Sequence, residues 1–505
     1  MAKYLVILLA MGWAVPRVFG YPLVILQPNA DTPISSPYLK AYPGIEWRVQ
    51  IVPHGGVPPF EYAIQGPAGM SVTDRGIVSW PEPGAEGSPH AVTAAITDAA
   101  GTGVSHAWQV TVTTAGFLFV DANEGSPSAD GSYAHPVRNI NDYYRSQKSD
   151  STYANHIVYY YSGVYTLDGC QISSAGSSWE RVEFPGNKPG AHLAVPGERP
   201  VFDWQDRGPM MRLGTGMNYL RGITFRNGAN MHLQTGGDNT VISECRFENL
   251  NGWFESGANA ADIMFLATRS PDGHDAVGIM NNVGVGTGSD YRNACAIKMY
   301  SLEKVALGYN EWTGGAAGPT EGFAFKAGVQ DYFAFQNRMA GFADHAFGGN
   351  MHDETGLITR GEICYSLVLG SHRGGPGVGD NQRGAMVLNQ DGMAGATWIH
   401  HNTFQGRVYG WHDGPFTLEN NVIVNEDYRV NDYGTTGVHI GWGADPVQMV
   451  FGEGDKANLV GNTASGIIDP NGLLTAAYSQ YASTHGFQNA CPGMPACGPS
   501  DPNTP

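Results

Sequence analysis

The amino-acid sequence predicts an all-β protein, in which a small β-sandwich precedes a long right-handed parallel β-helix. Three observations support this fold class: a short pattern that recurs along the second half, apolar residues that alternate with polar ones around it, and an unusual composition. The 505 residues include 69 glycines, and charged residues make up only 15%. This composition suits many short strands and tight turns, and it argues against a helical protein.

The recurring pattern has an amide or a thiol at its centre. The centres are Cys245, Asn282, Asn310, Asn337, Cys364, Asn402, Asn421 and Asn462. A repeat of this length predicts stacked coils of parallel strands, and an inward amide can bond the same amide one coil away. Ile223 fits as an earlier position of the same ladder. About ten coils would form a rod roughly 50 Å long at the usual strand spacing.

Residues 1–20 have the features of a secretory signal: Lys3, an apolar run from Tyr4 to Val15, and a small residue at Gly20. The alternative is a membrane anchor, but about 20 apolar residues are needed to span a bilayer, and Pro16-Arg17 interrupts the run. We therefore expect a secreted protein, extracellular, on the cell surface or periplasmic, without a membrane span after cleavage.

The net charge of -18 would become -20 on removal of residues 1–20, which contain Lys3 and Arg17 and no acid. A surface this acidic disfavours nucleic acid and anionic lipid as partners, since both reward a basic face. An acidic polysaccharide would need a local basic groove or a bridging cation.

Six cysteines in an exported chain suggest disulfides. Cys491 and Cys497 are the best pair, because the Pro-Gly turn between them can bring them together. Cys245 and Cys364 would lie four coils and roughly 19 Å apart, too far for a bond, and are expected to be small buried core residues. The sequence leaves the pairing of Cys170, Cys245, Cys295 and Cys364 open.

Residues 45–114, which follow a Pro-rich lead over 21–44, predict five short strands separated by Pro, Gly and Asp turns. They cover 47–52, 60–64, 76–80, 90–97 and 108–112. The run 56–62, then 67–70, 76–80 and 98–101 resembles the immunoglobulin-like, cadherin-like modules of bacterial surface proteins. The resemblance implies a spacer or a stabilising cap.

Residues 115–470 carry the coils. Phe119 to Ser126, with Asp130 to Pro136, resembles the opening of secreted right-handed parallel β-helix proteins. In those proteins a capping helix follows, and 137–147 has the apolar spacing for it. Residues 471–505 predict a C-terminal cap and a tail closed by the Cys491–Cys497 disulfide.

Counting back from the ladder suggests one column of outward side chains. Lys298 lies 12 residues before Asn310, Lys326 lies 11 before Asn337, and His352 lies 12 before Cys364. Two shielded lysines this close would lower each other's pKa, which can make a lysine a base near neutral pH. The alternative is that these and the charged residues around them are solvated surface groups.

Glu321 to Lys326, followed by Asn337, resembles the acid, strand lysine and next-strand asparagine of chondroitinase-B-like and alginate-lyase-like β-helix enzymes. The resemblance implies that Lys326 removes the proton alpha to a uronate carboxylate, while acidic residues hold calcium on that carboxylate. The family's arginine one coil on is missing, and His345 and His352 flank its place.

Cys295 to Lys298 resembles part of the Asp-Asp-Cys-x-Ala-Ile-Lys stretch of polygalacturonases, but Asn293 and Ala294 stand where the paired aspartates would be. Hydrolysis by two carboxylates is therefore unsupported. His400 and His401 precede a ladder position, and alternation turns one of them inward, so a core or turn role is expected rather than metal binding.

We therefore predict a polysaccharide-active protein, with an eliminative lyase on a uronate-containing glycan as the first interpretation. The expected catalytic residues are Lys326, Lys298, His352 and His345; the expected calcium ligands are Glu321, Asp344 and Asp353; the expected substrate-binding residues are Arg338, Arg360 and the exposed aromatics Tyr300, Trp312 and Tyr332. The alternative is a non-catalytic surface fibre, adhesin or glycan-binding protein. Polar coil ends favour a monomer.

Overall fold

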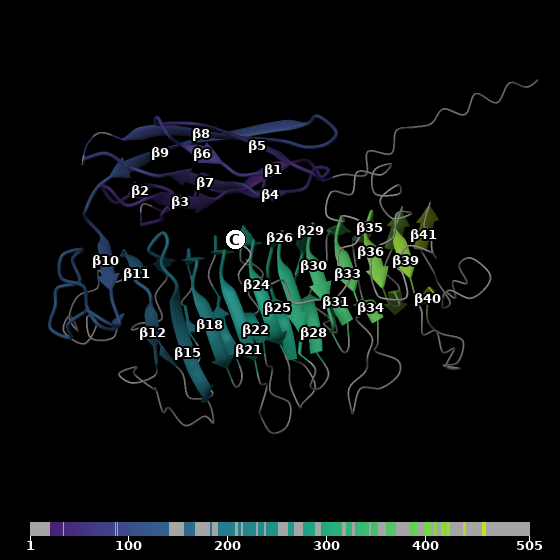
Figure 1. Ribbon diagram of the computed structural model, residues 1–505. Coiled ribbons are helices and arrows are strands. Elements are labelled where there is room, and N and C mark those ends of the chain that lie inside the picture. The colour runs from purple at the N-terminus through teal and green to yellow at the C-terminus, as the bar shows by residue number, and fades with distance from the viewer. Residues whose placement is uncertain are drawn as a thin grey trace, which may run out of the picture.

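A computed structural model of the chain shows an antiparallel module lying along the side of a long parallel coil (Figure 1). The described residues are 21–33, 35–85, 87, 89–140, 156–166, 182–183, 190–207, 211–213, 216–228, 231–236, 239–250, 261–266, 276–287, 294–315, 320–325, 329–342, 345–351, 360–369, 384–390, 397–405, 408–411, 416–419, 421–424, 438–440 and 457–460. The described residues contain no helix that is long and apolar enough to cross a membrane.

Nine strands form the module. They are β1 (Val24–Gln27), β2 (Lys40–Ala41), β3 (Trp47–Gln50), β4 (Val52–His54), β5 (Glu61–Gln65), β6 (Ser71–Val72), β7 (Ile77–Trp80), β8 (His90–Thr97) and β9 (Gly103–Val112). They make sheets in the orders β2-β9-β8-β5, β3-β7-β6 and β1-β4. The Pro-rich lead thus supplies β1 and β2, which pair with β4 and β9, and does not stand apart from the predicted sandwich. The immunoglobulin-like type of this module stays a prediction.

The coil contains three sheets, which we call the first, second and third sheet in the order in which each coil visits them. The first sheet has twelve strands: β10 (Phe117–Val120), β11 (Ile157–Tyr160), β14 (Ala191–Ala194), β17 (Tyr219–Arg221), β20 (Val241–Ser243), β23 (Val277–Met280), β26 (Lys304–Gly308), β29 (Asp331–Phe335), β32 (Arg360–Cys364), β35 (Thr397–His400), β38 (Phe416–Glu419) and β41 (Ala457–Val460).

The second and third sheets each have ten strands. The second consists of β12 (Gly163–Tyr165), β15 (Pro200–Arg207), β18 (Thr224–Gly228), β21 (Arg246–Leu250), β24 (Val283–Thr287), β27 (Glu311–Gly314), β30 (Arg338–Ala340), β33 (Leu367–Leu369), β36 (Thr403–Gln405) and β39 (Val422–Val424). The third consists of β13 (Val182–Glu183), β16 (Met211–Arg212), β19 (Met231–Thr235), β22 (Ala261–Leu266), β25 (Ala294–Tyr300), β28 (Thr320–Phe325), β31 (His345–Met351), β34 (Gly384–Gln390), β37 (Val408–Trp411) and β40 (Val438–Ile440).

The strand pairing confirms the predicted parallel β-helix. Each strand pairs in parallel with the next strand of its own sheet, which from β11 onward lies three strands later in the chain. The one exception among the described pairs of the three sheets is β37–β40, which is antiparallel. The predicted capping helix and the C-terminal cap with its disulfide fall largely or wholly outside the described residues. Of the expected cap, Val137 and Ile140 are described, and both are buried in the core of the coil.

Buried amides form the ladder that the sequence predicted. Asn282 Nδ2 donates to Asn310 Oδ1 at 3.0 Å, and Asn310 Nδ2 donates to Asn337 Oδ1 at 3.0 Å. Asn402 donates to Asn421 in the same way, also at 3.0 Å. Each of these amides also donates to a backbone carbonyl of the preceding coil, so a buried polar group is satisfied at every step.

The ladder position between Asn337 and Asn402 belongs to Ser366, so the assignment of Cys364 to the ladder was wrong by two residues. The backbone N–H of Asn337 donates to Ser366 Oγ at 3.2 Å, and that of Ser366 donates to Asn402 Oδ1 at 2.9 Å. A hydroxyl can replace the amide here because it too accepts a hydrogen bond. Cys364 instead lies on the strand before the turn. Asn462 is outside the described residues.

The described cysteines are buried and free, which confirms that Cys245 and Cys364 are not joined. Cys245 does occupy the ladder position, since its N–H donates to Asn282 Oδ1 at 3.0 Å. Ile223 holds the ladder position before Cys245, as predicted. Its carbonyl accepts from the N–H of Arg246, just as the carbonyl of Cys245 accepts from the N–H of Val283 one coil later.

The module shares a hydrophobic core with the outer face of the first sheet. Val52 packs on Gly278, where a Cβ atom would lie 2.6 Å from Val52 Cγ2. Phe60 contacts Phe333 and Phe335 with ring centroids 6.3 and 5.3 Å apart. Burial of aromatic side chains on both partners contributes several kcal/mol. The module is thus docked on the coil and is not a loosely linked spacer.

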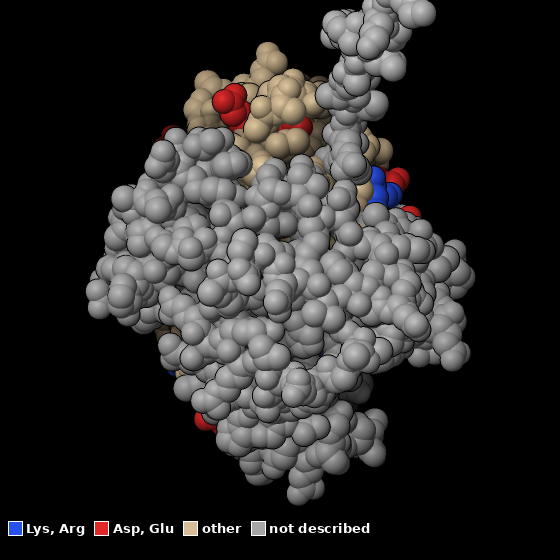
Figure 2. All heavy atoms as spheres, turned by 90° about the vertical axis from the view of Figure 1, so that its right-hand side faces the viewer, with Lys and Arg blue, Asp and Glu red and all other residues tan. Residues whose placement is uncertain are grey.

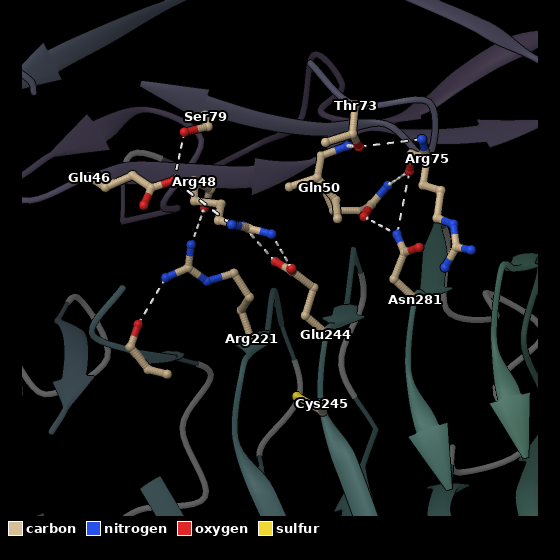
Figure 3. Close-up of polar contacts among 12 residues, drawn as sticks. Glu46, Arg48, Gln50, Thr73, Arg75, Ser79, Arg221, Glu244, Cys245 and Asn281 are labelled. Carbon is tan, nitrogen blue, oxygen red and sulfur yellow. Dashed lines mark hydrogen bonds and ion pairs between the residues drawn. The ribbon is translucent and has the colours of Figure 1, made fainter. Parts of the chain in front are cut away.

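Polar contacts fix the same docking (Figure 3). Arg48 of β3 makes a two-pronged ion pair with Glu244, and Arg221 donates to the carbonyl of Arg48 at 3.0 Å. Gln50 Oε1 accepts from Asn281 Nδ2 at 2.7 Å. Arginine and carboxylate in this geometry add orientation as well as energy. The interface therefore sets both the position and the register of the module along the coil.

Gly278 gives a direct test of this packing. Gly278→Ala should lower the free energy of unfolding by about 1–3 kcal/mol, because its methyl group overlaps Val52. Val52→Ala in the same chain should restore much of that loss. Urea unfolding of the two single variants and the double variant measures the coupling. Strictly additive losses would show that the two side chains do not meet.

A second buried polar group lies inside the coil. Asp262 accepts hydrogen bonds from Trp312 Nε1, at 2.8 Å, and from Thr287 Oγ1, and its Oδ1 lies 3.5 Å from His232 Nε2. Burial raises the pKa of Asp262 to about 7 and lowers that of His232 to about 3. Both groups therefore favour their neutral forms inside the coil.

Asp262→Asn should change how stability depends on pH. The raised pKa means that Asp262 contributes most below its unfolded value of 3.8 and that this contribution is lost as pH rises through about 7. The variant keeps the hydrogen-bond acceptor for Trp312 and removes the charge. Its free energy of unfolding should therefore exceed that of the original chain by an amount that grows between pH 4 and 7, to at most about 4 kcal/mol. Thermal unfolding across this range checks it, and a gain independent of pH would contradict the assignment.

Candidate functional site

The outer face of the third sheet gathers several of the predicted site residues. In β25, Ala296, Ile297 and Met299 pack in the core of the coil. Two consecutive inward residues reset the alternation, so Cys295 and Lys298 lie on the outer face. Cys295 packs there in a small cluster of its own with Met231, Ala261 and Ala324.

Register aligns a thiol, a carboxylate and an imidazole on this face. Cys295 lies opposite Glu321, and Glu321 lies opposite His345, on the adjacent strands β25, β28 and β31. Cys295 Sγ donates to Glu321 Oε2 at 3.2 Å, and His345 Nε2 lies 3.9 Å from the same oxygen. Glu321 thus stands between a weak donor and a group that can carry a positive charge.

Lys298 belongs to the neighbouring column, where it lies opposite Ala324, which in turn lies opposite Gly348. Gly348 also makes room for His345, whose Nε2 lies 1.7 Å from the place that a Cβ atom would take. The geometry of His345 therefore depends on a glycine, which sequence reasoning passed over.

The exposed fractions order these groups by depth. His345 is 7% exposed, Glu321 is 5% exposed and Lys298 is 1% exposed. His345 and Glu321 therefore lie closest to solvent, whereas the lysine is almost completely buried.

The predicted column of Lys298, Lys326 and His352 was wrong in its register. Lys298 pairs with Ala324, two residues before Lys326, and the next strand pairs through Gly348, four residues before His352. Lys326 and His352 lie outside the described residues, as do Asp344 and Asp353. Tyr300, at the end of β25, is half-buried.

Two of the expected sugar-stacking aromatics are not exposed. Trp312 and Tyr332 are both fully buried in the core of the coil. Trp312 donates to Asp262 and fits beside Gly284, and the ring of Tyr332 stacks on Phe325 with centroids 4.1 Å apart. Their role is to fill the interior, so neither can contact a polymer outside the coil.

The two predicted substrate-binding arginines lie on other sheets. Arg338 begins β30 of the second sheet and pairs with Glu311 at 3.3 Å. Arg360 begins β32 of the first sheet, pairs with Asp331 at 2.5 Å and covers the ring of Tyr21 from the module. Neither arginine shares the outer face of the third sheet with Lys298 and His345.

The described charges elsewhere do not suggest a basic groove. Seen from the C-terminal end of the coil, the described surface in view is mostly uncharged, with a few acidic side chains and a small group of Lys or Arg side chains at its right edge (Figure 2). This agrees with the net charge of -18. A local site for an acidic ligand would therefore depend on cations near the third sheet, of which Lys298 is described.

Calcium finds a poor set of ligands around Glu321 in the described part of the chain. The neighbours of its Oε2 atom are a thiol and an imidazole. Calcium takes six to eight oxygen ligands. A calcium site here would rest on Asp344 and Asp353, which lie outside the described residues, so it stays a prediction.

No family model and no curated protein matches the chain. Among solved structures it is similar to pectate lyase Pel9A, with 15% identity, coverage of 70% of this chain and 78% of that chain, and a TM-score of 0.37. It is also similar to a rhamnogalacturonan lyase, with 14% identity, coverage of 72% of this chain and 91% of that chain, and a TM-score of 0.37. A family 28 exopolygalacturonase from Yersinia enterocolitica has 10% identity, coverage of 84% of this chain and 97% of that chain, and a TM-score of 0.34. These values transfer no residue roles to this chain.

Proposed function

We propose that this chain is an exported protein that acts on an acidic polysaccharide at the outer face of the third sheet, by an eliminative reaction. The observation that carries the proposal is the placement of Lys298, Glu321 and His345 on one face of three consecutive strands. The signal-like residues 1–20 support export. A long sheet face suits a polymer, because side chains from successive coils can contact successive sugar units.

The eliminative reaction needs a base, a charge and a proton donor. A base takes the proton alpha to the uronate carboxylate, the electron pair left behind forms a carbon–carbon double bond, and the glycosidic oxygen leaves with a proton. His345 is the base that the geometry favours, because the Glu321 carboxylate 3.9 Å from its Nε2 stabilises the imidazolium that forms. Lys298, which lies on the same face, is the described group that would bind the substrate carboxylate.

This arrangement changes the role expected of Lys326. The sequence resemblance made it the base, whereas the described geometry offers His345 for that step. Lys326 and His352 remain candidates for the proton that the leaving oxygen requires. No step is assigned to calcium.

The second candidate function is non-catalytic binding of a glycan by a rod-shaped surface protein. The burial of Lys298, Glu321 and His345 favours it, because a catalytic group must reach its substrate. In this case the cluster would stabilise the sheet face and the polymer would bind elsewhere on the coil.

Ultraviolet absorbance of unsaturated uronate products separates the two candidates. The full chain is incubated with alginate, chondroitin, pectin and ulvan, with added calcium and with chelator. We expect product from at least one polymer, and His345→Ala should lower its rate by about 10²–10⁴-fold. Gly348→Ala should also lower the rate, because its methyl group displaces the His345 ring.

The matched control is His106→Ala, which removes a half-buried histidine of the module and should leave the rate unchanged. The lyase proposal fails if the folded chain gives no product from any polymer while one of the polymers slows its migration in an affinity gel. That result would favour the binding protein. Full activity of His345→Ala would exclude His345 as the base.

A further inference from the structure

A second group of metal-ligating side chains lies on the first sheet, on strands β32 and β35. Glu362 and Cys364 are two residues apart on β32 and therefore point to the same side. His400 of β35 lies opposite Cys364 in register. The preceding strand β29 places Phe333 and Phe335 on this side, against Phe60 of the module. The group therefore lies on the outer face, next to the docked module.

The three side chains are buried and close together. Glu362 and Cys364 are fully buried, and His400 is 1% exposed. A carboxylate oxygen, the thiol sulfur and a ring nitrogen all lie within 4.8 Å of one another. His400 Nε2 contacts Glu362 Oε1 at 2.8 Å. Such a set of donors at this spacing can converge on one ion.

One oxygen of Glu362 lacks a hydrogen-bond partner of normal geometry among the described residues. Its Oε2 atom is buried and makes no hydrogen bond of normal geometry, and the Cys364 thiol contacts the carboxyl group only as a weak donor. Burying such an oxygen without a partner costs about 1–3 kcal/mol. Arg360, whose charge also acts on Glu362, pairs with Asp331 at 2.5 Å. A bound cation would offset that cost.

His400 is held for ligation by its neighbours. The ring of Trp398 stacks on it with centroids 3.6 Å apart. His400 Nδ1 bonds His401 Nδ1 at 2.9 Å, so one of these two nitrogens carries the proton. When His400 Nδ1 donates, its Nε2 atom presents a lone pair toward Glu362 and Cys364. His401 in turn stacks on Tyr365 at 5.0 Å, which fixes the second ring.

We propose that Glu362, Cys364 and His400 form a binding site for a divalent ion of the zinc class, with His401 as the partner that orients His400. Thiolate, imidazole and carboxylate are the ligands that zinc takes, at about 2.0–2.3 Å. Tetrahedral ligands at those lengths lie roughly 3.4–3.8 Å apart, so the Glu362–His400 contact opens slightly as the others close. The thiol proton and the proton between Glu362 and His400 pass to solvent as the bonds to the metal form.

The site is independent of the proposed lyase chemistry, since it lies on the first sheet and the candidate site lies on the third. It ties β32 to β35 beside the strand on which the module docks. An ion there would stabilise this part of the interface. The proposal adds metal binding to the core or turn role that the sequence predicts for His400 and His401.

Metal titration of the purified full chain tests the proposal. After chelator treatment and exchange, zinc is titrated in competition with a chromophoric chelator, and cobalt is titrated separately. We expect a tightly bound equivalent of zinc, and a cobalt spectrum with the charge-transfer band of a cobalt–thiolate bond. His401→Ala should weaken zinc binding about 10–100-fold, as loss of an orienting partner does, and Cys364→Ser should weaken it further.

The matched controls are Cys245→Ser and His192→Gln, which change a buried thiol and a buried imidazole elsewhere in the coil and should leave binding unchanged. Where Cys364→Ser fails to fold, Glu362→Gln supplies the same comparison with the thiol intact. The proposal is overturned if no zinc binds, or if the cobalt–thiolate band persists in Cys364→Ser. It is also overturned if Glu362→Gln and His401→Ala both bind zinc as tightly as the original chain.

Discussion

The hydrogen bond from one buried ladder amide to the next is the constraint on which the rest of this structure depends. Asn310 bonds Asn337 on one side and accepts from Asn282 on the other, and a carbonyl of the previous coil takes its second N–H. A turn whose interior polar groups are all satisfied cannot slip by one residue without burying unpaired groups. From β20 to β39, the ladder therefore fixes where each first-sheet strand ends and where the following second-sheet strand begins.

Each ladder turn also requires a residue with a left-handed backbone just before the ladder residue, whether that residue is an asparagine, Cys245 or Ser366. These residues are Glu244, Asn281, Tyr309, Gln336, Tyr365 and His401, all with φ between 49° and 59°. Left-handed backbone at a residue other than glycine is strained, and the ladder bonds compensate for it. The turn projects these side chains outward, and Glu244, Asn281 and Tyr309 contact the module through Arg48, Gln50 and Tyr62. The ladder thus also prepares the docking surface.

The docked module covers one sheet of the coil and leaves the other two uncovered by its own described residues. It covers much of the first sheet, so that face is closed to a polymer wherever Phe60, Val52 and Arg48 lie. The third sheet keeps its own outer groups, with Glu321 between Cys295 and His345. This arrangement explains why Arg360 contacts Asp331 and the module's Tyr21, and why the candidate site and the proposed metal site lie on different sheets.

The sequence predicted the coil well because alternation and a recurring amide are local features. Positions on the third sheet were predicted poorly, since the segments between ladder and third sheet differ in length from coil to coil, and counting misplaced Lys298 relative to Lys326. The ladder position of Ser366 was missed because its hydroxyl accepts the hydrogen bond that an asparagine side chain accepts in the other coils. Burial of Trp312 could not be predicted because it depends on Gly284 and Asp262, which are distant in sequence. Docking of the module likewise depends on pairs far apart in the chain.

Hydrogen exchange of the full chain with and without an acidic oligosaccharide tests most directly whether the outer face of the third sheet is the functional face. The account predicts slower exchange in peptides covering β25, β28 and β31, where Lys298, Glu321 and His345 lie, with the module and the first sheet unchanged. Protection confined to the module, residues 45–114, or to the first sheet would contradict it.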